Sequence, residues 1–311
     1  MNLETAVWAE KWRPKTVDDC IIPDKVKKEI KELMADGNIP HLLFSGSAGT
    51  GKTTLARAIV NEMGGELLFI NASLESGIDT VRTKVMQYSS TVSFSGNQKF
   101  VLFDEFDGMS RNSMESLRGI VEEFKNVRFF FTCNYKNRII EAIQSRTTSI
   151  DFKVAPSDRS KLASQFFKRV LGILDSEGVE YDKKVVADLV TKYFPDFRRT
   201  LNELQRYSSS GKIDAGILVN ASKENFTELF GYLKEKNFPE MRKWVAKNSD
   251  VEATVLFRDI YDNANDLIDP KSIPQVVLIL ADYLNRCSNS VDQEIMIAAA
   301  MTELMANVKW K

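Results

Sequence analysis

The sequence is poor in the residues that metalloenzymes and nucleophilic hydrolases most often use. His41 is the single histidine among 311 residues, so neither a histidine metal cluster nor a Ser–His–Asp triad is available. The three cysteines, Cys20, Cys133 and Cys287, are far apart and form no C-x-x-C pair. This spacing argues against a zinc site or a disulfide framework, and we expect the cysteines to be small buried apolar residues.

Long apolar runs and an excess of one charge are also missing. No run approaches the roughly 20 apolar residues that a membrane helix needs, and the N-terminus lacks the basic start and apolar middle of a signal peptide. We therefore expect an intracellular protein without a membrane partner. The 42 Lys and Arg residues balance 43 Asp and Glu residues, which gives a net charge of −1. Any contact with nucleic acid must then be locally concentrated.

The sequence does contain short apolar runs that alternate with helical patterns between residues 39 and 152. Because these runs are almost continuously apolar, they predict strands buried on both faces, as in a parallel sheet covered by helices. We therefore expect an α/β domain here. The predicted strands are 41–45, 66–70, 99–103, 127–133 and 147–152.

Beyond residue 152 the strand-like runs stop and the spacing of apolar residues becomes helical. A three-helix unit is predicted, in which Ser157 is a possible cap of the first helix and Asp196 can cap the third. Its helices are expected over 157–178, 182–194 and 197–207.

The best linker in the chain is the Ser- and Gly-containing stretch 208–212. The region after it reads as helices alone, with a Met and aromatic stripe that is typical of a packed core. The stripe comprises Trp244, Phe257, Leu278, Leu280, Met296, Met301, Leu304 and Met305. The helices are predicted over 226–236, 239–247, 251–265, 272–286 and 292–308.

One motif carries a specific chemistry. The stretch GSAGTGKT, residues 46–53, fits G-x-x-x-x-G-K-[ST] and lies between a predicted strand and a predicted helix. Its glycines let backbone N–H groups close around phosphate oxygens, Lys52 supplies positive charge to the outer phosphates, and Thr53 supplies a hydroxyl for Mg²⁺. The sequence therefore predicts a nucleotide site.

A second feature narrows the chemistry. Asp104 and Glu105 directly follow the apolar strand 99–103, whose end is expected beside the P-loop. Asp104 can hold the Mg²⁺ shell and Glu105 can polarise an attacking water, although two carboxylates after a strand can also be surface residues. No N-K-x-D signature for guanine is present, so ATP is favoured over GTP.

Two further polar residues are weaker candidates. Asn134 follows another predicted strand, where its amide could orient the water or a γ-phosphate oxygen, or could simply belong to a turn. Arg198 lies in the first turn of the helix that Asp196 can cap, where it could meet a phosphate or point into solvent.

Together these motifs resemble those of AAA+ ATPases. The stretches EKWRPKTVDDCII and SLRGIVEE are similar to the clamp-loader branch of that family. The stretch FPDFRRTLNELQRYSSSGKIDAGIL and the terminal VKWK look most similar to sliding-clamp-loader large subunits of T-even-type bacteriophages. The resemblance implies an α/β P-loop AAA+ domain over 1–152, a helical lid domain over 153–211 and a helical collar domain over 212–311.

The resemblance also implies roles for single residues. Arg146, in Ser-Arg before the last predicted strand, would project into the ATP site of a neighbouring subunit and act there as a catalytic residue with Glu105 and Asn134. Mg²⁺ would be held by Thr53 and Asp104. The adenine end of the nucleotide would be bordered by Glu10, Lys11, Trp12, Arg13 and Ile21. ATP would also be bound by Gly49, Thr50, Gly51, Lys52, Thr53, Thr54 and the lid residue Arg198.

Three positions depart from the family pattern without removing a catalytic group. Thr147 replaces the Cys that usually follows Ser-Arg, Ile22 replaces a usual Gly, and DEFD stands in place of DEAD at residues 104–107.

The family's function is to open a ring-shaped sliding clamp with ATP and to place it on primer–template DNA during phage replication, in the cytoplasm of the infected bacterium. Four copies with one distinct small subunit are implied. Candidate contacts to DNA phosphates are Arg82, Lys84 and Arg111, while Arg118 could lie at the subunit interface. The alternatives are another AAA+ machine, such as a branch-migration motor or a helicase loader, and a scaffold that does not hydrolyse ATP.

Overall fold

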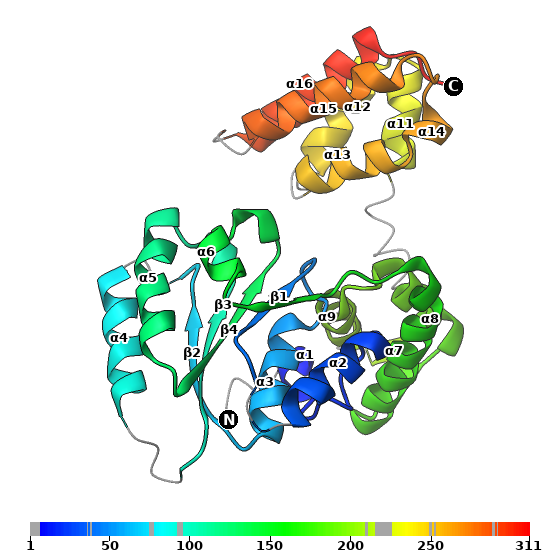
Figure 1. Cartoon of the computed structure of the whole chain (residues 1–311). Helices are drawn as coiled ribbons and strands as arrows, with labels where there is room; N and C mark the ends of the chain where they lie inside the picture. The colour runs from blue at the N-terminus through cyan, green and yellow to red at the C-terminus, as the bar shows by residue number, and fades with distance from the viewer. Residues whose placement is uncertain are drawn as a thin grey trace. The chain divides into compact units, whose positions relative to one another are not determined.

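The computed structural model describes residues 7–35, 37, 39–74, 78–91, 96–208, 211–214, 226–248, 251, 253–287, 290 and 292–311. The chain forms two compact units, residues 1–218 and 219–311, whose helices and strands are labelled in Figure 1. Among the described residues no helix is long and apolar enough to cross a membrane.

The first unit is built on a five-stranded parallel sheet with the order β2-β3-β4-β1-β5. The strands are β1 (Leu42–Ser45), β2 (Glu66–Asn71), β3 (Lys99–Asp104), β4 (Val127–Cys133) and β5 (Thr148–Asp151), so the predicted strands are confirmed to within a residue at each end. In β3, Phe100 packs into one core and Val101 into the other, and neither is exposed to solvent. Burial on both faces explains the continuous apolar runs of β1, β3 and β4, whereas β2, at the edge of the sheet, is only partly buried.

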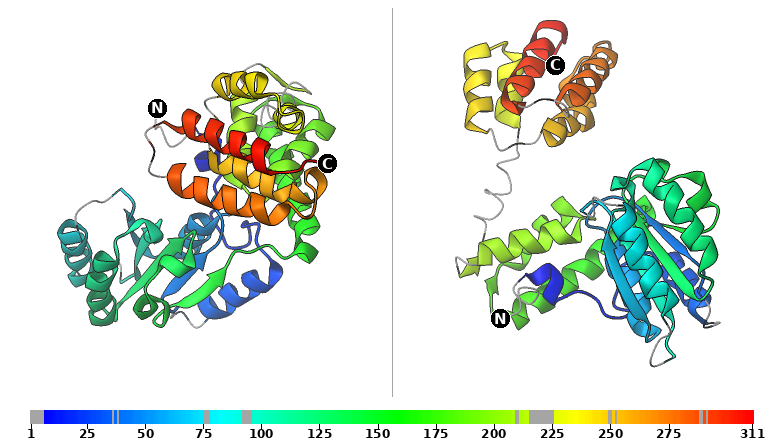
Figure 2. Two further views of the ribbon diagram at one scale, coloured as in Figure 1. Left: turned by 90° about the horizontal axis from the view of Figure 1, so that it is seen from above. Right: turned by 90° about the vertical axis from the view of Figure 1, so that its left-hand side faces the viewer.

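Helices cover both faces of this sheet (Figures 1 and 2). On one face, α2 (Asp24–Ala35) and α3 (Lys52–Glu62) bury Ile30 and Leu55 against the strands. On the other face lie α4 (Ile78–Ser90), α5 (Arg111–Glu123) and the short α6 (Glu141–Gln144). The predicted α/β class, a parallel sheet between helix layers, is therefore confirmed.

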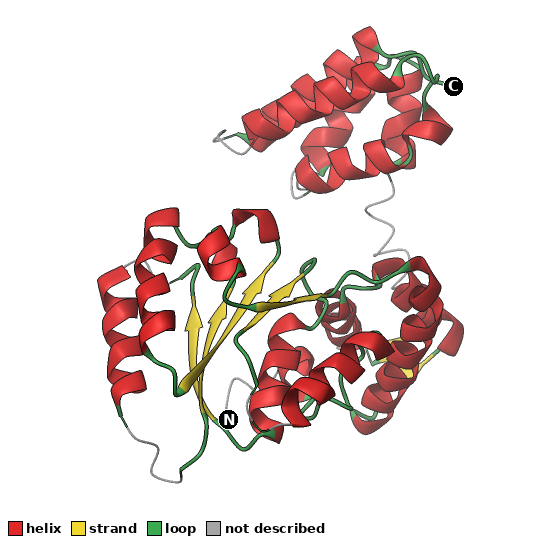
Figure 3. Cartoon of the chain, viewed as in Figure 1, coloured by secondary structure: helices red, strands yellow, loops and turns green. Residues whose placement is uncertain are grey.

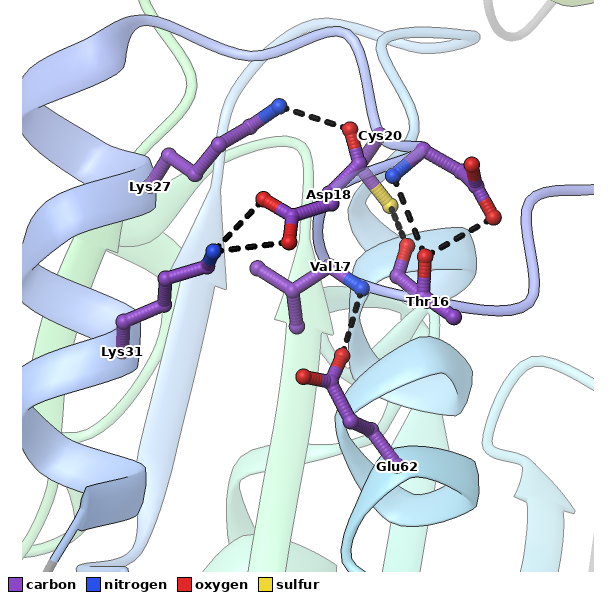
Figure 4. Close-up of polar contacts among 8 residues, drawn as sticks. Thr16, Val17, Asp18, Cys20, Lys27, Lys31 and Glu62 are labelled. Atoms are coloured by element: carbon purple, nitrogen blue, oxygen red, sulfur yellow. Dashed lines mark hydrogen bonds and ion pairs between the residues drawn. The ribbon is translucent and has the colours of Figure 1, made fainter.

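Hydrogen bonds and an ion pair hold the segment that precedes the sheet against α2 and α3 (Figure 4). After the short helix α1 (Trp8–Lys11), the Val17 backbone N–H donates to Glu62 Oε2 at 2.8 Å. Lys27 Nζ donates to the Asp18 carbonyl oxygen at 2.8 Å, and Lys31 forms an ion pair with the Asp18 carboxylate at 2.6 Å. These contacts fix the loop that runs on towards residues 20–22.

Three helices follow the sheet, as predicted: α7 (Pro156–Ser176), α8 (Lys183–Tyr193) and α9 (Phe197–Ser208). Asp196 caps α9, because its Oδ1 accepts the Arg199 backbone N–H at 2.9 Å. The predicted cap at Ser157 is wrong. α7 begins at Pro156, with Ala155 at the N-cap, so Ser157 lies inside the first turn. Proline fits the first helical position because its fixed φ is already helical and its missing N–H is not needed there.

The expectation that strands end near residue 153 was also wrong. A two-stranded parallel sheet joins β6 (Glu180–Tyr181) to β7 (Lys212–Ile213). Two-residue strands are too short to produce an apolar pattern. β7 takes Lys212 from the predicted linker 208–212, while residues 209, 210 and 215–225 lie outside the described part of the chain.

The second unit consists of helices around one core (Figure 3). They are α11 (Thr227–Lys234), α12 (Phe238–Lys247), α13 (Ala253–Asp262), α14 (Ala264–Leu267), α15 (Ile273–Cys287) and α16 (Gln293–Asn307). The Met and aromatic stripe is buried or packs against this core, except for Leu278, which is 66% exposed. Core placement of Leu278 was therefore wrong, because it lies on the outer side of α15. Near the C-terminus, Trp310 forms an antiparallel bridge with Ile268.

The rare residues occupy apolar positions. All three cysteines are free and buried, as expected. His41 Nδ1 accepts the Phe129 backbone N–H at 3.0 Å, and the His41 ring packs against the Phe129 ring. Burial, with a smaller contribution from the positive charge of Arg128, lowers the pKa of His41 from 6.5 to about 4.

Acid should therefore weaken the first unit through His41. As pH falls, the unfolded chain takes up a proton on His41 near pH 6.5, whereas the folded chain does so only near about 4, so stability falls across this window. Protonation of His41 should lower the free energy of unfolding by about 3 kcal/mol at the acidic end of this window. His41→Asn, whose amide oxygen can still accept the Phe129 N–H, should lose this part of the pH dependence. Urea unfolding of both proteins at neutral and acidic pH measures the difference, and identical pH profiles would contradict the assignment.

Candidate functional site

A pocket opens in the first unit at the carboxyl ends of β1, β3 and β4, which are neighbours in the sheet. Its walls come from the P-loop, the strand ends, the N-terminal segment and the helices α7 and α9. In open α/β sheets this edge of the sheet is where ligands bind, because the loops after the strands diverge there.

The P-loop needs glycine for two physical reasons. Gly51 has φ 95° and is the N-cap of α3, a left-handed conformation that side chains disfavour. Gly49 has φ 73°, and a Cβ atom added to it would lie 1.9 Å from Asp196 Oδ1. The loop therefore lies tightly against the start of α9, and the N-terminus of α3 points its free N–H groups into the pocket.

Lys52 is held within the loop. Its Nζ donates to the carbonyl oxygens of Gly46 and Ser47 at 2.8 and 2.7 Å, and to Asn134 Oδ1 at 2.9 Å. The side chain is buried, and this burial lowers the pKa of the Lys52 ammonium, although the nearby carboxylates of Asp104 and Asp107 act in the opposite direction. A phosphate at this point would replace those carbonyl partners with a negative charge.

Thr53 and Asp104 present oxygen atoms side by side. Thr53 Oγ1 donates to Asp104 Oδ1 at 2.6 Å, although the two residues come from α3 and β3. Hydroxyl and carboxylate oxygens are the ligands that Mg²⁺ prefers, and it commonly takes only one or two protein ligands beside phosphate oxygens and waters. The described residues contain no cluster of three or more His, Cys, Asp or Glu side chains that could hold a metal alone. The donor set therefore fits Mg²⁺ bound together with a nucleotide.

Glu105 adopts a conformation that is uncommon for a residue with a side chain. Its φ and ψ are 54° and 42°, in the left-handed region. Ser73 Oγ donates to Glu105 Oε2 at 2.6 Å, and Asn71 Oδ1 accepts the Ser73 backbone N–H at 3.0 Å. The turn after β2 therefore holds the Glu105 carboxylate, a contact that sequence reasoning missed.

The loop that carries Asn134 is held by Asp107. Asp107 Oδ2 accepts the backbone N–H groups of Asn134 and Tyr135 at 3.1 and 3.0 Å. The last residue of DEFD therefore fixes the strand end from which Asn134 reaches Lys52.

Aromatic residues from the helices after the sheet close the other end of the pocket. Phe166 of α7 and Phe197 of α9 both line it, with ring centroids 4.6 Å apart. Arg169 Nη2 donates to the Trp12 carbonyl oxygen at 3.1 Å and so ties α7 to the N-terminal segment. This apolar end suits the flat base of a nucleotide.

The start of α9 also contacts the P-loop directly. The Phe197 backbone N–H donates to the Gly49 carbonyl oxygen at 3.1 Å. Arg198, the next residue, lines the pocket. A ligand that changes the conformation of the P-loop would therefore also shift the start of α9 through this hydrogen bond.

Arg146 lies outside the pocket and has an acidic partner that the sequence did not suggest. It forms an ion pair with Glu122 of α5, and its Nη1 donates to the Ala142 carbonyl oxygen at 2.6 Å. Glu122 also accepts from Arg118 at 3.3 Å. The hydrogen bond from Arg146, followed by that from Arg118, lowers the pKa of Glu122.

Comparison with known proteins identifies the family. Residues 158–219 match the AAA+ ATPase lid domain of sliding-clamp-loader large subunits, and residues 42–154 match the AAA family of ATPases associated with various cellular activities. The chain is similar to the sliding-clamp-loader large subunit of Enterobacteria phage T4, with 34% identity over 100% of this chain and 99% of that protein. The chain belongs to this family of AAA+ ATPases.

Other relatives agree with this family assignment. The replication factor C small subunit of Sulfurisphaera tokodaii is 32% identical, over 98% of this chain and 97% of that protein. The structure of the Thermotoga maritima RuvB Holliday junction branch migration motor superposes with a TM-score of 0.56, at 16% identity, over 72% of this chain and 79% of that one. Such low identity supports a shared AAA+ fold alone. The chain is therefore a nucleotide-binding ATPase with a lid and a helical C-terminal region.

Most of the predicted site residues lie together in the pocket. Those that line it are Glu10, Trp12, Arg13, Ile21, Gly49, Thr50, Gly51, Lys52, Thr53, Thr54, Asp104, Glu105, Asn134 and Arg198. Lys11 and Arg146 are not lining residues, and Lys11 pairs instead with Glu177 at 2.7 Å. Sequence reasoning missed the lining residues Thr132, Phe166, Arg169, Phe197 and Leu201. Only the aromatic start of α9, beside the predicted Asp196 cap, gave a signal that could have found one of them.

Proposed function

We propose that this chain is the ATPase subunit of a sliding-clamp loader, which uses ATP to open a ring-shaped clamp and to place it on primer–template DNA in an infected bacterial cell. The observation that carries the proposal is full-length similarity to a sliding-clamp-loader large subunit, which includes the helical C-terminal unit. A pocket that brings P-loop, strand-end carboxylates and lid residues together supports the ATP-dependent part of this function.

ATP occupies the pocket with its phosphates on the P-loop and its base between the N-terminal segment and the aromatic residues of α7 and α9. Lys52 exchanges its bonds to loop carbonyls for phosphate oxygens, and Arg198 approaches the phosphates from the lid. Thr53 and Asp104 are the residues that hold Mg²⁺. When bound, this ion would neutralise part of the charge of the phosphates.

Hydrolysis requires a rearrangement of Glu105. Its carboxylate now accepts from Ser73, and it must turn away from that hydroxyl to accept a proton from the attacking water. Asn134 orients the water or a phosphate oxygen, since Asp107 fixes its backbone. Arg146 serves the site of an adjacent copy, where its guanidinium meets charge that develops on the phosphoryl group.

The Arg146 contacts support action between subunits. Its ion pair with Glu122 holds the guanidinium at the surface of α5 and α6, outside the pocket of its own chain. The guanidinium can be delivered to a neighbour without unfolding any element, because exposed ion pairs contribute little to stability. ATP binding then favours a closed assembly and hydrolysis releases it.

The second unit offers a surface for assembly. On α15, Val277, Leu278 and Leu284 are 38%, 66% and 39% exposed, and Ile295 of α16 is 64% exposed. Burial of these side chains against other subunits would be favourable, because it removes apolar surface from water. We assign this surface to the collar, in which four copies meet one distinct small subunit.

DNA is contacted through its phosphates. Arg82 and Lys84 are exposed on α4, and Arg111 is exposed at the start of α5, where it pairs loosely with Glu115 at 3.6 Å. Because α4 and α5 pack side by side, these charges lie on one layer of the first unit (Figure 1). Arg118, already paired with Glu122, is assigned to the subunit interface.

The decisive experiment measures phosphate release by the assembled loader with clamp, with primed DNA, with both and with neither. Strong stimulation only when both are present is expected, with the Lys52→Ala assembly as the inactive control. Stimulation by branched DNA without a clamp would identify a branch-migration motor instead. No phosphate release under any condition would identify a scaffold.

A further inference from the structure

Thr132 of β4 occupies a position between the two acidic residues of the site. It is 1% exposed, yet it lines the pocket. Its Oγ1 donates to Asp104 Oδ1 at 2.6 Å and accepts the Glu105 backbone N–H at 3.1 Å. One buried hydroxyl therefore contacts the side chain of the first acidic residue and the backbone of the second.

The sheet explains why a side chain is needed at this point. The β3/β4 ladder ends at the pair Phe103↔Phe131, whereas β4 continues along β1, with Thr132 opposite Phe44. On its β4 side, β3 therefore has no backbone partner beyond this pair, although Asp104 still pairs with Asn71 of β2 on the other side. The Thr132 hydroxyl takes the place of the next ladder hydrogen bond, just where Glu105 turns into its left-handed conformation.

The hydrogen bond that the Thr132 hydroxyl donates also orients the Asp104 carboxylate. Asp104 Oδ1 accepts from Thr53 Oγ1 and from Thr132 Oγ1, both at 2.6 Å. If Thr53 turned its oxygen towards Mg²⁺, Thr132 would remain as the neutral donor that keeps Asp104 oriented. A hydroxyl can donate to a carboxylate and accept an N–H at the same time, which an aliphatic side chain cannot do.

We propose that Thr132 is a positioning residue for the magnesium–nucleotide site, which orients the Asp104 carboxylate and anchors the turn at Glu105. This inference rests on the magnesium site proposed above. Partners of metal ligands orient the ligand and tune its affinity, and their loss typically costs about 10- to 100-fold in metal affinity.

The test uses the full-length chain and a fluorescent ADP analogue whose binding is titrated with Mg²⁺. Thr132→Val keeps the shape of the side chain and removes both hydrogen bonds, so the half-saturating Mg²⁺ concentration should rise about 10- to 100-fold. Affinity for the analogue in EDTA should be unchanged, because the P-loop contacts are intact. Thr132→Ser restores the hydroxyl and should return the Mg²⁺ dependence to that of the original chain. Thr132→Ala tests the same loss without the risk of overpacking by valine.

A matched control separates positioning from stability. Phe129→Leu alters an equally buried β4 side chain that has no hydrogen bond to either acidic residue, and it should lower the melting temperature without moving the Mg²⁺ dependence. Unchanged Mg²⁺ dependence in both Thr132→Val and Thr132→Ala would overturn the proposal, as would a serine variant as impaired as the alanine one. An original chain that binds the analogue equally well with and without Mg²⁺ would instead reject the magnesium site itself.

Discussion

Replacing Arg146 by alanine should reduce ATP hydrolysis by the assembled loader about a thousandfold while leaving nucleotide binding unchanged. The side chain lies outside the pocket of its own chain, so its loss removes no contact to the bound nucleotide. It removes a fixed positive charge that a neighbouring site needs as charge develops on the transferred phosphoryl group. Phosphate release and binding of a fluorescent ATP analogue, measured on the same assembly, test the two halves of this prediction.

A mixing experiment shows whether Arg146 acts between subunits. A Lys52→Ala subunit cannot bind phosphate normally but still carries Arg146, whereas an Arg146→Ala subunit keeps its own pocket. In a mixed assembly, some intact pockets of Arg146→Ala subunits therefore lie beside the intact arginine of a Lys52→Ala subunit. Hydrolysis should partly recover in the mixture. Arg206→Ala, which removes an exposed arginine paired with Glu203, is the control for loss of charge and should hydrolyse ATP normally. Absence of recovery on mixing would show that Arg146 does not serve a neighbour.

Glu105→Gln should be the other severe variant, with hydrolysis reduced by about 10²- to 10⁴-fold, the usual contribution of a general base. Glutamine keeps the size of the side chain but cannot accept a proton from water. Nucleotide binding should persist, since Lys52 and the P-loop are unchanged, and the assembly should remain in its ATP-bound form. Single-turnover hydrolysis and retention of bound ATP on a desalting column provide the measurements.

Ser73→Ala is the matched control for Glu105. It removes the hydrogen-bond partner of the carboxylate and leaves the carboxylate itself in place. Hydrolysis should be kept or raised, by up to about tenfold, because the free energy of that hydrogen bond no longer opposes the turn of Glu105. If Ser73→Ala were as inactive as Glu105→Gln, the contact would be needed for catalysis and the proposed rearrangement would be wrong.

The sheet was predictable because its signal is local. A parallel strand buried on both faces must be apolar at nearly every position, and β1, β3 and β4 each read that way. The same reasoning could not find β6 and β7, since each contributes two residues and is defined by its partner. Leu278 was misplaced because helical spacing shows that an apolar face exists, but not whether another chain covers it.

The parts of the site that could be predicted are those whose residues are contiguous in the sequence. The P-loop and the Asp104–Glu105 pair are short motifs whose residue types follow from phosphate and metal chemistry. The lid residues Phe166 and Phe197 look like ordinary helix residues, and only packing brings them into the pocket. The boundary between residues 152 and 153 and the catalytic roles of the site residues stay predictions.

The sequence by itself determined that this chain is a P-loop ATPase with helices after its sheet, because those features depend on residue types at short, fixed spacings. Only the tertiary structure decided that Ser73 holds Glu105, that Thr132 contacts both acidic residues, and that Glu122 pairs with Arg146. In the sequence, Ser73 and Glu105 are 32 residues apart and Asp104 and Thr132 are 28 residues apart. Glu122 and Arg146 are 24 residues apart. Hydrogen bonds over such separations follow no periodicity, since strand order and helix packing alone bring the side chains together.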